Sequence, residues 1–269
     1  MSIEVRNLNC GYRKRKVLNR FNFSVEESSF LCVLGPNGVG KSTLFKCLLG
    51  LHPTYEGSIT IDGKDIRKIK VTELAKLISY VPQSHHPTFN YTVLEMVLMG
   101  TSSQFSSLSS PRKEHMDKAY AAMEKVGIEK LSERGFAEIS GGERQLALIA
   151  RALAQQARTL IMDEPTANLD YGNQLRVLQK IRELVNSGYT VIQSTHNPDQ
   201  ALLFADQVLA ISEGKIIAEG SPTQIITSEN IRKLYQIDII REHLCGGKIH
   251  ICVPKFAIDI VSQVRHPAS

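Results

Sequence analysis

The sequence predicts an α/β fold built around a mostly parallel sheet. Residues 30–34, 159–162 and 190–194 are continuously apolar or β-branched, which is typical of strands buried on both faces of a parallel sheet. Between the last two runs, apolar residues recur every three to four positions: Leu175, Leu178, Ile181 and Val185. This spacing indicates a crossover helix that ends near Gly188, and the strand-helix-strand order indicates parallel strands.

The other elements are expected around these strands. Residues 2–5 and 21–25 alternate apolar and polar positions, so we expect an N-terminal antiparallel β portion before the first buried strand. Residues 84–155 show helical patterns and no convincing strand, and we expect helices at 92–99, 113–126 and 144–154. Beyond the sheet, Glu213 and Gly214 indicate a hairpin between 207–211 and 215–218, followed by a helix at 222–236 and a strand at 248–253.

These elements predict a single domain that occupies residues 1–269. Its core is expected to consist of residues 1–83 and 156–236, and residues 84–155 to form an inserted helical subdomain. Residues 237–269 are expected to form a C-terminal tail. Within the helical part, the Ser-rich residues 101–110 are expected to be a flexible connection.

The composition indicates a globular protein from a reducing cytosol. With 42% hydrophobic residues the chain can bury a sizeable core, and its net charge of +5 is mild. The short basic run at 13–16 could suit anionic lipid, nucleic acid or a nucleotide, but a solvated turn is the favoured interpretation, and no nucleic-acid partner is expected. The five cysteines contain no CxxC pair, which argues against a zinc site or a disulfide framework, and His85 and His86 are expected on a surface loop.

Membrane insertion and secretion are not expected from this sequence. Its apolar runs are far shorter than the about 20 residues that span a bilayer. The N-terminus shows no basic flank followed by an apolar stretch, so no secretion signal is expected. A membrane role would therefore require a partner that does the spanning.

Residues 35–43 match the phosphate-binding pattern G-x-x-x-x-G-K-[ST] and lie between an apolar strand and a helix expected at 43–49, which stops at Gly50. Glycines allow successive backbone N–H groups to converge on phosphate oxygens, and the helix points its positive end at the same anion. Lys41 would reach the β- and γ-phosphates, and Ser42 would offer its hydroxyl to Mg²⁺. The alternative, a plain turn between strand and helix, leaves Lys41 and Ser42 unexplained.

Three titratable residues follow buried strands at the edge where ligands of open α/β sheets bind. Asp163 and Glu164 follow the strand at 159–162, and adjacent side chains on a strand point in opposite directions. One acid can therefore face Mg²⁺ and the other an attacking water. His196 follows the strand at 190–194 and is expected near the γ-phosphate or the water. The alternative for Asp163 is a turn residue before Pro165.

A second anion site is expected where Ser140, Gly141, Gly142 and Glu143 open the helix at 144–154. Ser140 is a plausible helix cap, and the two glycines allow a phosphate to approach the N–H groups. A chain with one phosphate-binding loop has no use for a second phosphate site of its own. The second site is explained if it contacts a nucleotide held by another copy of the chain. The alternative is an ordinary helix start that contains glycine.

Together these motifs resemble those of the ATP-binding subunits of ABC transporters, over nearly the whole chain. The resemblance implies a P-loop NTPase core whose Walker A motif is the glycine-rich loop. It further implies that residues 160–164 are Walker B and 139–143 the signature motif. Gln83 would be the Q-loop glutamine, Asp170 the aspartate of the D-loop and His196 the switch histidine.

The resemblance also implies a role for each residue. The ATP-binding residues would be Tyr12, Gly35, Pro36, Asn37, Gly38, Gly40, Lys41, Ser42 and Thr43, with Tyr12 stacking on adenine. The catalytic residues would be Lys41, Gln83, His196 and the general base Glu164. The Mg²⁺ ligands would be Ser42, Gln83 and Asp163. The residues that reach the ATP of a second copy would be Ser140, Gly141, Gly142, Glu143 and Asp170.

Within that family, the residues from the signature motif through Gln155 and the short tail are similar to importers of iron-siderophore, haem and cobalamin. This implies two ATPase copies that dimerise on binding ATP at the cytoplasmic face of the cell membrane. Polytopic permease subunits and an external binding protein would complete the transporter. Ile139, Glu143 and Asn168 depart from the commonest motifs, and Asn168 leaves the coupling across the dimer open.

Two alternatives remain for the activity. A soluble ABC ATPase acting on a cofactor-assembly or nucleic-acid complex would use the same motifs to move a different partner. The chain lacks the second cassette of ribosome-acting relatives and the long coiled coils of genome-maintenance relatives. A P-loop kinase is the weaker alternative, because it has no use for residues 140–143.

Overall fold

The computed structural model describes residues 2–13, 15–83, 89–104, 112–258 and 260, and it contains a central six-stranded sheet. Its strands, in spatial order, are β10 (Lys215–Gly220), β9 (Gln207–Ser212), β3 (Phe30–Leu34), β8 (Thr190–Thr195), β7 (Thr159–Met162) and β6 (Ile78–Val81). All neighbours pair in parallel except β9 and β10. The α/β prediction is therefore confirmed.

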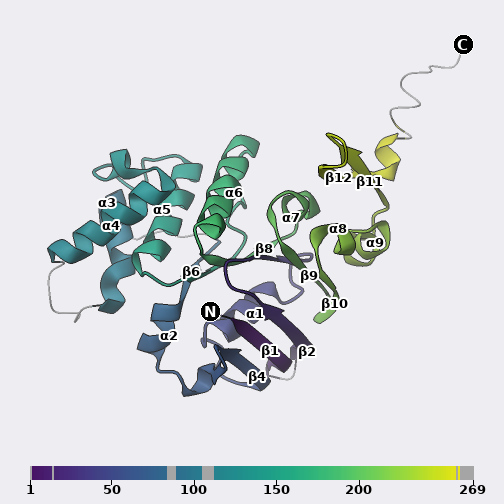
Figure 1. Cartoon of the computed structure of the whole chain (residues 1–269), viewed down its shortest axis with the longest axis horizontal. Helices are drawn as coiled ribbons and strands as arrows, with labels where there is room; N and C mark the ends of the chain where they lie inside the picture. Colours follow the sequence, from purple (N-terminus) through teal and green to yellow (C-terminus); the bar gives the residue numbers. More distant parts are fainter. Residues whose placement is uncertain (1, 14, 84–88, 105–111, 259, 261–269) are drawn as a thin grey trace, which may run out of the picture.

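A second, antiparallel sheet lies beside the first (Figure 1). Its spatial order is β2 (Arg15–Val25), β1 (Ile3–Tyr12), β4 (Tyr55–Ile61) and β5 (Lys64–Asp65). Helix α1 (Lys41–Leu48) shares one apolar core with both sheets, in which Phe21, Leu31 and Leu44 are buried together. This packing fixes the loop before α1 between the sheets.

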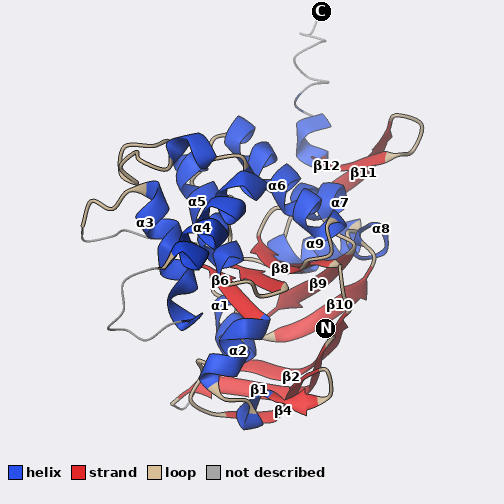
Figure 2. Ribbon diagram, turned by 60° about the vertical axis from the view of Figure 1, so that its left-hand side comes forward, coloured by secondary structure: helices blue, strands red, loops and turns tan. Residues whose placement is uncertain are grey.

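Helices pack against the other face of the central sheet (Figures 1 and 2). Helices α5 (Gly141–Ala154), α6 (Tyr171–Asn186) and α7 (Pro198–Phe204) contact its strands. The elements α3 (Val93–Leu98), η2 (Met99–Gln104) and α4 (Lys113–Val126) pack around α5, and η3 (Glu129–Leu131) contacts α4. Residues 90–154 show no strand in their described part beyond a single bridge between Thr92 and Gly135. Met123 of α4 and Leu160 of β7 belong to one continuous core, so these helices share their apolar interior with the sheet.

The C-terminal part differs from its prediction. The helix expected at 222–236 is two helices, α8 (Pro222–Ile225) and α9 (Ser228–Tyr235), because the Thr227 hydroxyl accepts the Asn230 N–H at 3.2 Å and begins a new helix. The strand expected at 248–253 is half of a hairpin formed by β11 (Ile239–Leu244) and β12 (Ile249–Pro254). Cys252 N–H donates to Asp199 at 2.8 Å, which attaches the hairpin to α7 (Pro198–Phe204).

Several short elements were missing from the predictions. The strands expected at 2–5 and 21–25 extend to form β1 and β2, with irregular register that interrupts their alternation. No sequence pattern predicted six of them: β4, β5, β6, the turn η1 (Ile66–Lys68), α2 (Val71–Leu77) and α7. These elements are short and partly polar, and their positions depend on packing against distant segments. Residues 101–104, expected to begin a flexible connection, instead belong to η2, where Thr101 is buried. The expectations for His85, His86 and residues 105–110 lie outside the described residues.

Along the described part of the chain, no helix combines the length and the apolar character that crossing a bilayer requires.

Candidate nucleotide site

The glycine-rich loop connects β3 to α1, and two of its glycines are required by close packing. A Cβ at Gly35 would lie 2.5 Å from the carbonyl oxygen of Ile211. Gly40 has a φ of 112°, and a Cβ there would lie 2.8 Å from Cδ2 of Leu18. At Gly35 a side chain would displace the loop because the nearest atom is a backbone carbonyl oxygen, whereas at Gly40 the positive φ itself favours glycine. No side chain caps α1, so its first N–H groups are available to a ligand.

Lys41 holds a buried positive charge at the start of α1. Its ammonium donates to the carbonyl oxygens of Gly35 at 2.8 Å and Pro36 at 3.1 Å. The same nitrogen lies 3.1 Å from Oε1 of Glu164, and both side chains are almost fully buried. A charge in this environment is stable only with such partners. The ammonium is therefore held at the centre of the loop.

The two acids expected after the buried strand follow β7 and share one hydroxyl. Ser194 Oγ of β8 donates to Oδ1 of Asp163 at 2.6 Å and accepts the Glu164 N–H at 2.9 Å. Glu164 has a φ of 43°, which is rare for a residue with a Cβ and marks a strained turn. This turn separates the two carboxylates, and both border one cavity.

The carboxylate of Glu164 is a meeting point of the predicted catalytic residues. Gln83, just after β6, donates from Nε2 to Oε2 of Glu164 at 3.5 Å, the long limit for a hydrogen bond. His196, just after β8, places Nδ1 3.4 Å from the same oxygen, and its side chain is 55% exposed. Three strands and α1 thus bring Lys41, Gln83 and His196 to one carboxylate. These residues are separated by more than 150 positions in the sequence.

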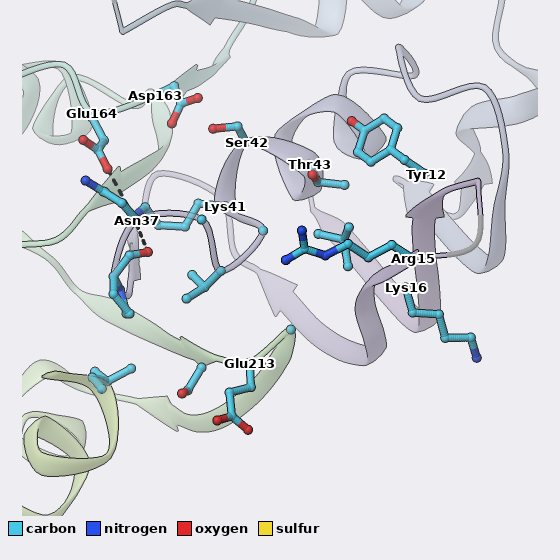
Figure 3. A pocket seen from close by; sticks show the side chains of 18 of the residues that line it. Tyr12, Arg15, Lys16, Asn37, Lys41, Ser42, Thr43, Asp163, Glu164 and Glu213 are labelled. Carbon is cyan, nitrogen blue, oxygen red and sulfur yellow. Dashed lines mark hydrogen bonds and ion pairs between the residues drawn. The ribbon is translucent and has the colours of Figure 1, made fainter. Parts of the chain in front are cut away.

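A cavity of about 950 Å³ contains this cluster at one end. Figure 3 shows Asp163, Glu164 and Ser42 on one side and Tyr12 with Arg15 on the other. The predicted residues that line it are Tyr12, Pro36, Asn37, Gly38, Gly40, Lys41, Ser42, Thr43, Gln83, Asp163 and Glu164. Two predicted site residues, Gly35 and His196, are not among the described residues that line the cavity. The acids and the ring of Tyr12 therefore border the same cavity from different sides.

Sequence reasoning missed four charged residues that line the same cavity. Arg15 and Lys16 belong to the basic run that was expected to be a solvated turn. Both are exposed, but they begin β2 and border the cavity, so that expectation was incomplete. Glu213 and Lys233 come from the β9–β10 turn and from α9. The nearness of Arg15 to Tyr12 was the available signal, whereas nothing local marks Lys233.

The predicted signature residues form a separate feature at the start of α5. Ser140 caps the helix by accepting the Glu143 N–H at 3.3 Å, and the Glu143 carboxylate accepts the Ser140 N–H at 2.8 Å. The hydrogen bonds from Ser140 lower the pKa of Glu143. A Cβ at Gly142 would lie 2.5 Å from Oδ1 of Asn173, so α5 and α6 approach closely there.

Asp170 lies at the start of α6. Its carboxylate accepts the Asn173 N–H at 2.9 Å and the Asn173 side-chain amide at 2.7 Å. These two hydrogen bonds from Asn173 lower the pKa of Asp170. Neither Asp170 nor any of residues 140–143 is among the described residues that line the cavity. The chain thus carries the two predicted groups of residues at separate places.

Comparison with known proteins identifies this arrangement. The family model described as ABC transporter matches residues 18–167, which is more than half of the chain. The chain belongs to the ABC transporter family. The resemblance stated from the motifs is therefore confirmed, and so is the α/β P-loop fold. Members of this family are ATPases coupled to transport, so the chain binds ATP and is an ATPase.

Relatives and solved structures agree over most of their length. An uncharacterized ABC transporter ATP-binding protein of Haemophilus influenzae is 42% identical over 91% of this chain and 94% of its own. A protein of Helicobacter pylori, described as an iron chelatin transport ATP-binding protein, is 37% identical over 87% of this chain and 93% of its own. A structure described as an ABC transporter of the metal-chelate type, in an inward-facing conformation, has a TM-score of 0.83 and 32% identity, covering 94% of this chain and 97% of that one.

Proposed function

We propose that this ABC transporter ATPase powers an importer of metal chelates, such as iron-siderophore, haem or cobalamin. The names of the Helicobacter relative and of the solved metal-chelate type transporter support this substrate class. The ATPase subunits would lie at the cytoplasmic face of the cell membrane beneath polytopic permease subunits. An external binding protein would deliver the chelate to those subunits.

The observation that carries the mechanism is the separation of two predicted phosphate-binding features in one chain. The loop around Lys41 and the acids after β7 border one cavity, whereas Ser140 and Asp170 lie outside its lining. Two copies arranged head to tail would place the α5 start of one copy at the cavity of the other. ATP would then be bound between two chains, and neither copy alone would hold a finished site.

Within that composite site, each residue has a chemical task. Glu164 would orient or deprotonate the attacking water, with Gln83 and His196 beside its carboxylate. Lys41, whose ammonium now contacts Glu164, would neutralise charge on the γ-phosphate. Tyr12 would stack on adenine at the far end of the cavity.

Mg²⁺ fits the donor atoms at the acid end of this cavity. Ser42, Gln83 and Asp163 offer a hydroxyl, an amide oxygen and a carboxylate, and hard divalent cations prefer such oxygen ligands. Asp163 already accepts the Ser194 hydroxyl with one oxygen, so its other oxygen can bind the ion. The bound ion would neutralise phosphate charge.

An apolar groove of about 400 Å³ offers a docking surface for the permease. It lies where α2, η2 and the end of α5 meet, at the border between residues 84–155 and the core formed by 1–83 and 156–236. Leu51 and Val71 line it and are exposed by 65% and 79%. An apolar segment of the permease would cover these side chains. Closure of the dimer would then move residues 84–155 and pull on that segment.

The central test is the exchange of Glu164 for Gln, which keeps the size of the side chain and removes the base. We expect the ATPase rate to fall by about 10²- to 10⁴-fold, while ATP stabilises a dimer that is detectable by light scattering. Glu213→Gln is the matched control, because Glu213 lines the same cavity but lies outside the Glu164 cluster. Undiminished turnover in Glu164→Gln contradicts the mechanism.

Copurification separates the importer from the alternative, an ABC ATPase acting on a soluble complex. We expect the tagged chain to copurify with a polytopic membrane protein, and Val71→Glu to abolish this without reducing the ATPase rate. Leu203→Asp serves as the control, because Leu203 is exposed and lies outside the groove. Copurification with a cofactor-assembly or nucleic-acid complex instead contradicts the importer. Uptake of labelled iron chelate in cells carrying Lys41→Ala then tests the substrate class.

A further inference from the structure

Three metal-binding side chains that are distant in the sequence meet behind the nucleotide cavity. Cys10 lies on β1, Cys47 on α1 and His52 just after α1, and all three are buried. The two Sγ atoms and a ring nitrogen of His52 lie within 4.8 Å of one another. The cysteine spacing argued against a zinc site because sequence patterns report only ligands that are close along the chain. The fold brings these ligands together through the packing of α1 on β1.

The imidazole of His52 is oriented as a metal ligand is. Its Nδ1 lies 2.8 Å from the carbonyl oxygen of Thr54, and because a carbonyl only accepts, Nδ1 carries the proton. The Thr54 N–H also approaches Nδ1, at 3.4 Å, but this contact is longer and weaker. In the neutral ring, Nε2 then carries the lone pair. A carbonyl that binds the other ring nitrogen is the usual support of a metal-bound histidine.

Nε2 of His52 is a buried polar atom with no hydrogen-bond partner among the described residues. The ring is 6% exposed, so water does not supply the missing partner from bulk solvent. Leaving such an atom unpaired costs about 1–3 kcal/mol. The nearby Tyr55 hydroxyl, on the residue paired with Cys10 across β1 and β4, is also buried without a partner among the described residues. A bound ion with its water would satisfy both groups.

The sulfur positions are suited to a metal ion. The two Sγ atoms are 3.3 Å apart. Two zinc–sulfur bonds of about 2.3 Å at a tetrahedral angle place the sulfurs roughly 3.8 Å apart. A disulfide requires a separation of about 2.05 Å. The observed distance is therefore nearer to that of two thiolates on one ion, and a small rotation of either side chain reaches it.

We propose that Cys10, Cys47 and His52 bind one thiophilic ion, Zn²⁺ or Cu⁺, in a structural site at the back of the nucleotide cavity. Binding releases the two thiol protons, and the thiolates and imidazole donate three electron pairs to the ion. For Zn²⁺, a water beside Tyr55 completes four ligands, whereas Cu⁺ is satisfied by three. The site does not depend on the transported substrate or on the dimer.

The site would position the aromatic wall of the cavity. The ring of His52 meets the ring of Tyr12 edge-on, with centroids 4.9 Å apart at 61°. Tyr12 lines the cavity, and Nζ of Lys46 lies 5.9 Å from the centre of its ring. An ion that fixes His52 therefore also limits the motion of Tyr12. The main chain of His52 is held as well, because its backbone N–H donates to the Lys46 carbonyl at 3.1 Å.

Metal content of the purified full-length chain tests this proposal. The reduced chain is stripped with a chelator, incubated with Zn²⁺ or with Cu⁺ in separate samples, desalted and analysed by mass spectrometry of the elements. We expect one ion per chain with at least one of the two metals. Cys10→Ser, Cys47→Ser and His52→Ala should each weaken binding by at least about 10- to 100-fold. Whichever ion binds more tightly is assigned to the site.

Two controls make the result specific. Cys245→Ser removes an exposed cysteine on the β11–β12 hairpin, where the rings of His243 and His250 also meet, and it should leave the stoichiometry unchanged. Co²⁺ should give a sulfur-to-metal absorption band that is lost in Cys10→Ala and Cys47→Ala, variants checked for cooperative melting. Absence of metal in the folded wild-type chain overturns the proposal. Equal metal in the double variant lacking Cys10 and Cys47, or a Cys10–Cys47 disulfide in the metal-treated chain, also overturns it.

Discussion

Helices α1 and α5 both begin after glycine-containing segments, but their first turns are prepared differently. The cap of α1 is Gly40, which has no side chain, and the first residue of the helix is the buried Lys41. The cap of α5 is Ser140, and Glu143 closes a capping box on it. The α1 start is thus positive with free N–H groups, whereas the α5 start already pairs with an acid.

This difference indicates two kinds of phosphate contact. The N–H groups of α1 and the ammonium of Lys41 can bind a phosphate within one chain. At α5, the carboxylate of Glu143 reduces the positive charge of the helix end, so its attraction for a free nucleotide is weak. The α5 start is therefore suited to a nucleotide that another copy already holds. On the proposed function, one chain would therefore carry a primary site and the complement to its partner's site.

Mixing two inactive variants is the strongest test of this difference. Lys41→Ala removes the primary contact, and Ser140→Arg blocks the complementary surface. Each alone should lower the ATPase rate by more than about 100-fold. In a mixed dimer, one of the two composite sites is free of both changes. An equal mixture should therefore recover up to about a quarter of the wild-type rate, as random pairing of the chains predicts.

The control is an equal mixture of chains carrying Lys41→Ala and chains carrying Glu164→Gln. Both changes lie in the primary site, so every mixed dimer lacks an intact composite site and the rate should stay low. Size-exclusion chromatography with ATP confirms that the chains exchange. No recovery in the first mixture, with exchange demonstrated, contradicts the composite site.

Much of the primary site was predictable because its residues follow local rules. The loop before Lys41 matches a pattern that requires a strand before it and a helix after it, and both are present. Asp163, Glu164 and His196 follow buried strands, and the parallel sheet brings the ends of such strands to one edge. The approach of Lys41 to Glu164 therefore follows from topology once the strands are recognised.

The parts that were missed depend on contacts between distant segments. Arg15 reads as part of a charged turn, and its place at the cavity follows from the pairing of β1 with β2. Lys233 reaches the cavity because α9 folds back on β9. The meeting of Cys10 with Cys47 likewise requires the packing of β1 on α1. No local pattern reports such contacts, since each residue alone is compatible with a surface or a core position.

The next largest effect should come from the backbone of the α1 cap. Gly40→Ala adds a Cβ at a φ of 112° within 2.8 Å of Leu18, so backbone strain and overpacking together should lower the free energy of unfolding by roughly 2–5 kcal/mol. Gly38→Ala is the matched control: its φ is 80°, but nothing lies within 4 Å of an added Cβ. It should cost only the backbone strain, about 1–2 kcal/mol. Urea unfolding measures both, and equal losses contradict the packing argument.

The smallest expected effect concerns the aromatic end of the cavity. Arg15→Ala removes an exposed positive charge beside Tyr12, so we expect the KM for ATP to rise by about two- to fivefold with little change in kcat. The effect should shrink at high salt, because exposed charges are screened within about 10 Å at 0.1 M. Arg6→Ala is the control, since Arg6 pairs with Glu4 and does not line the cavity. If both variants raise KM equally, the effect reflects net charge. A rise confined to Arg15→Ala instead shows that this end of the cavity contacts the nucleotide. The nucleotide would then be attracted there by an exposed charge, unlike at the other end, where the buried ammonium of Lys41 lies.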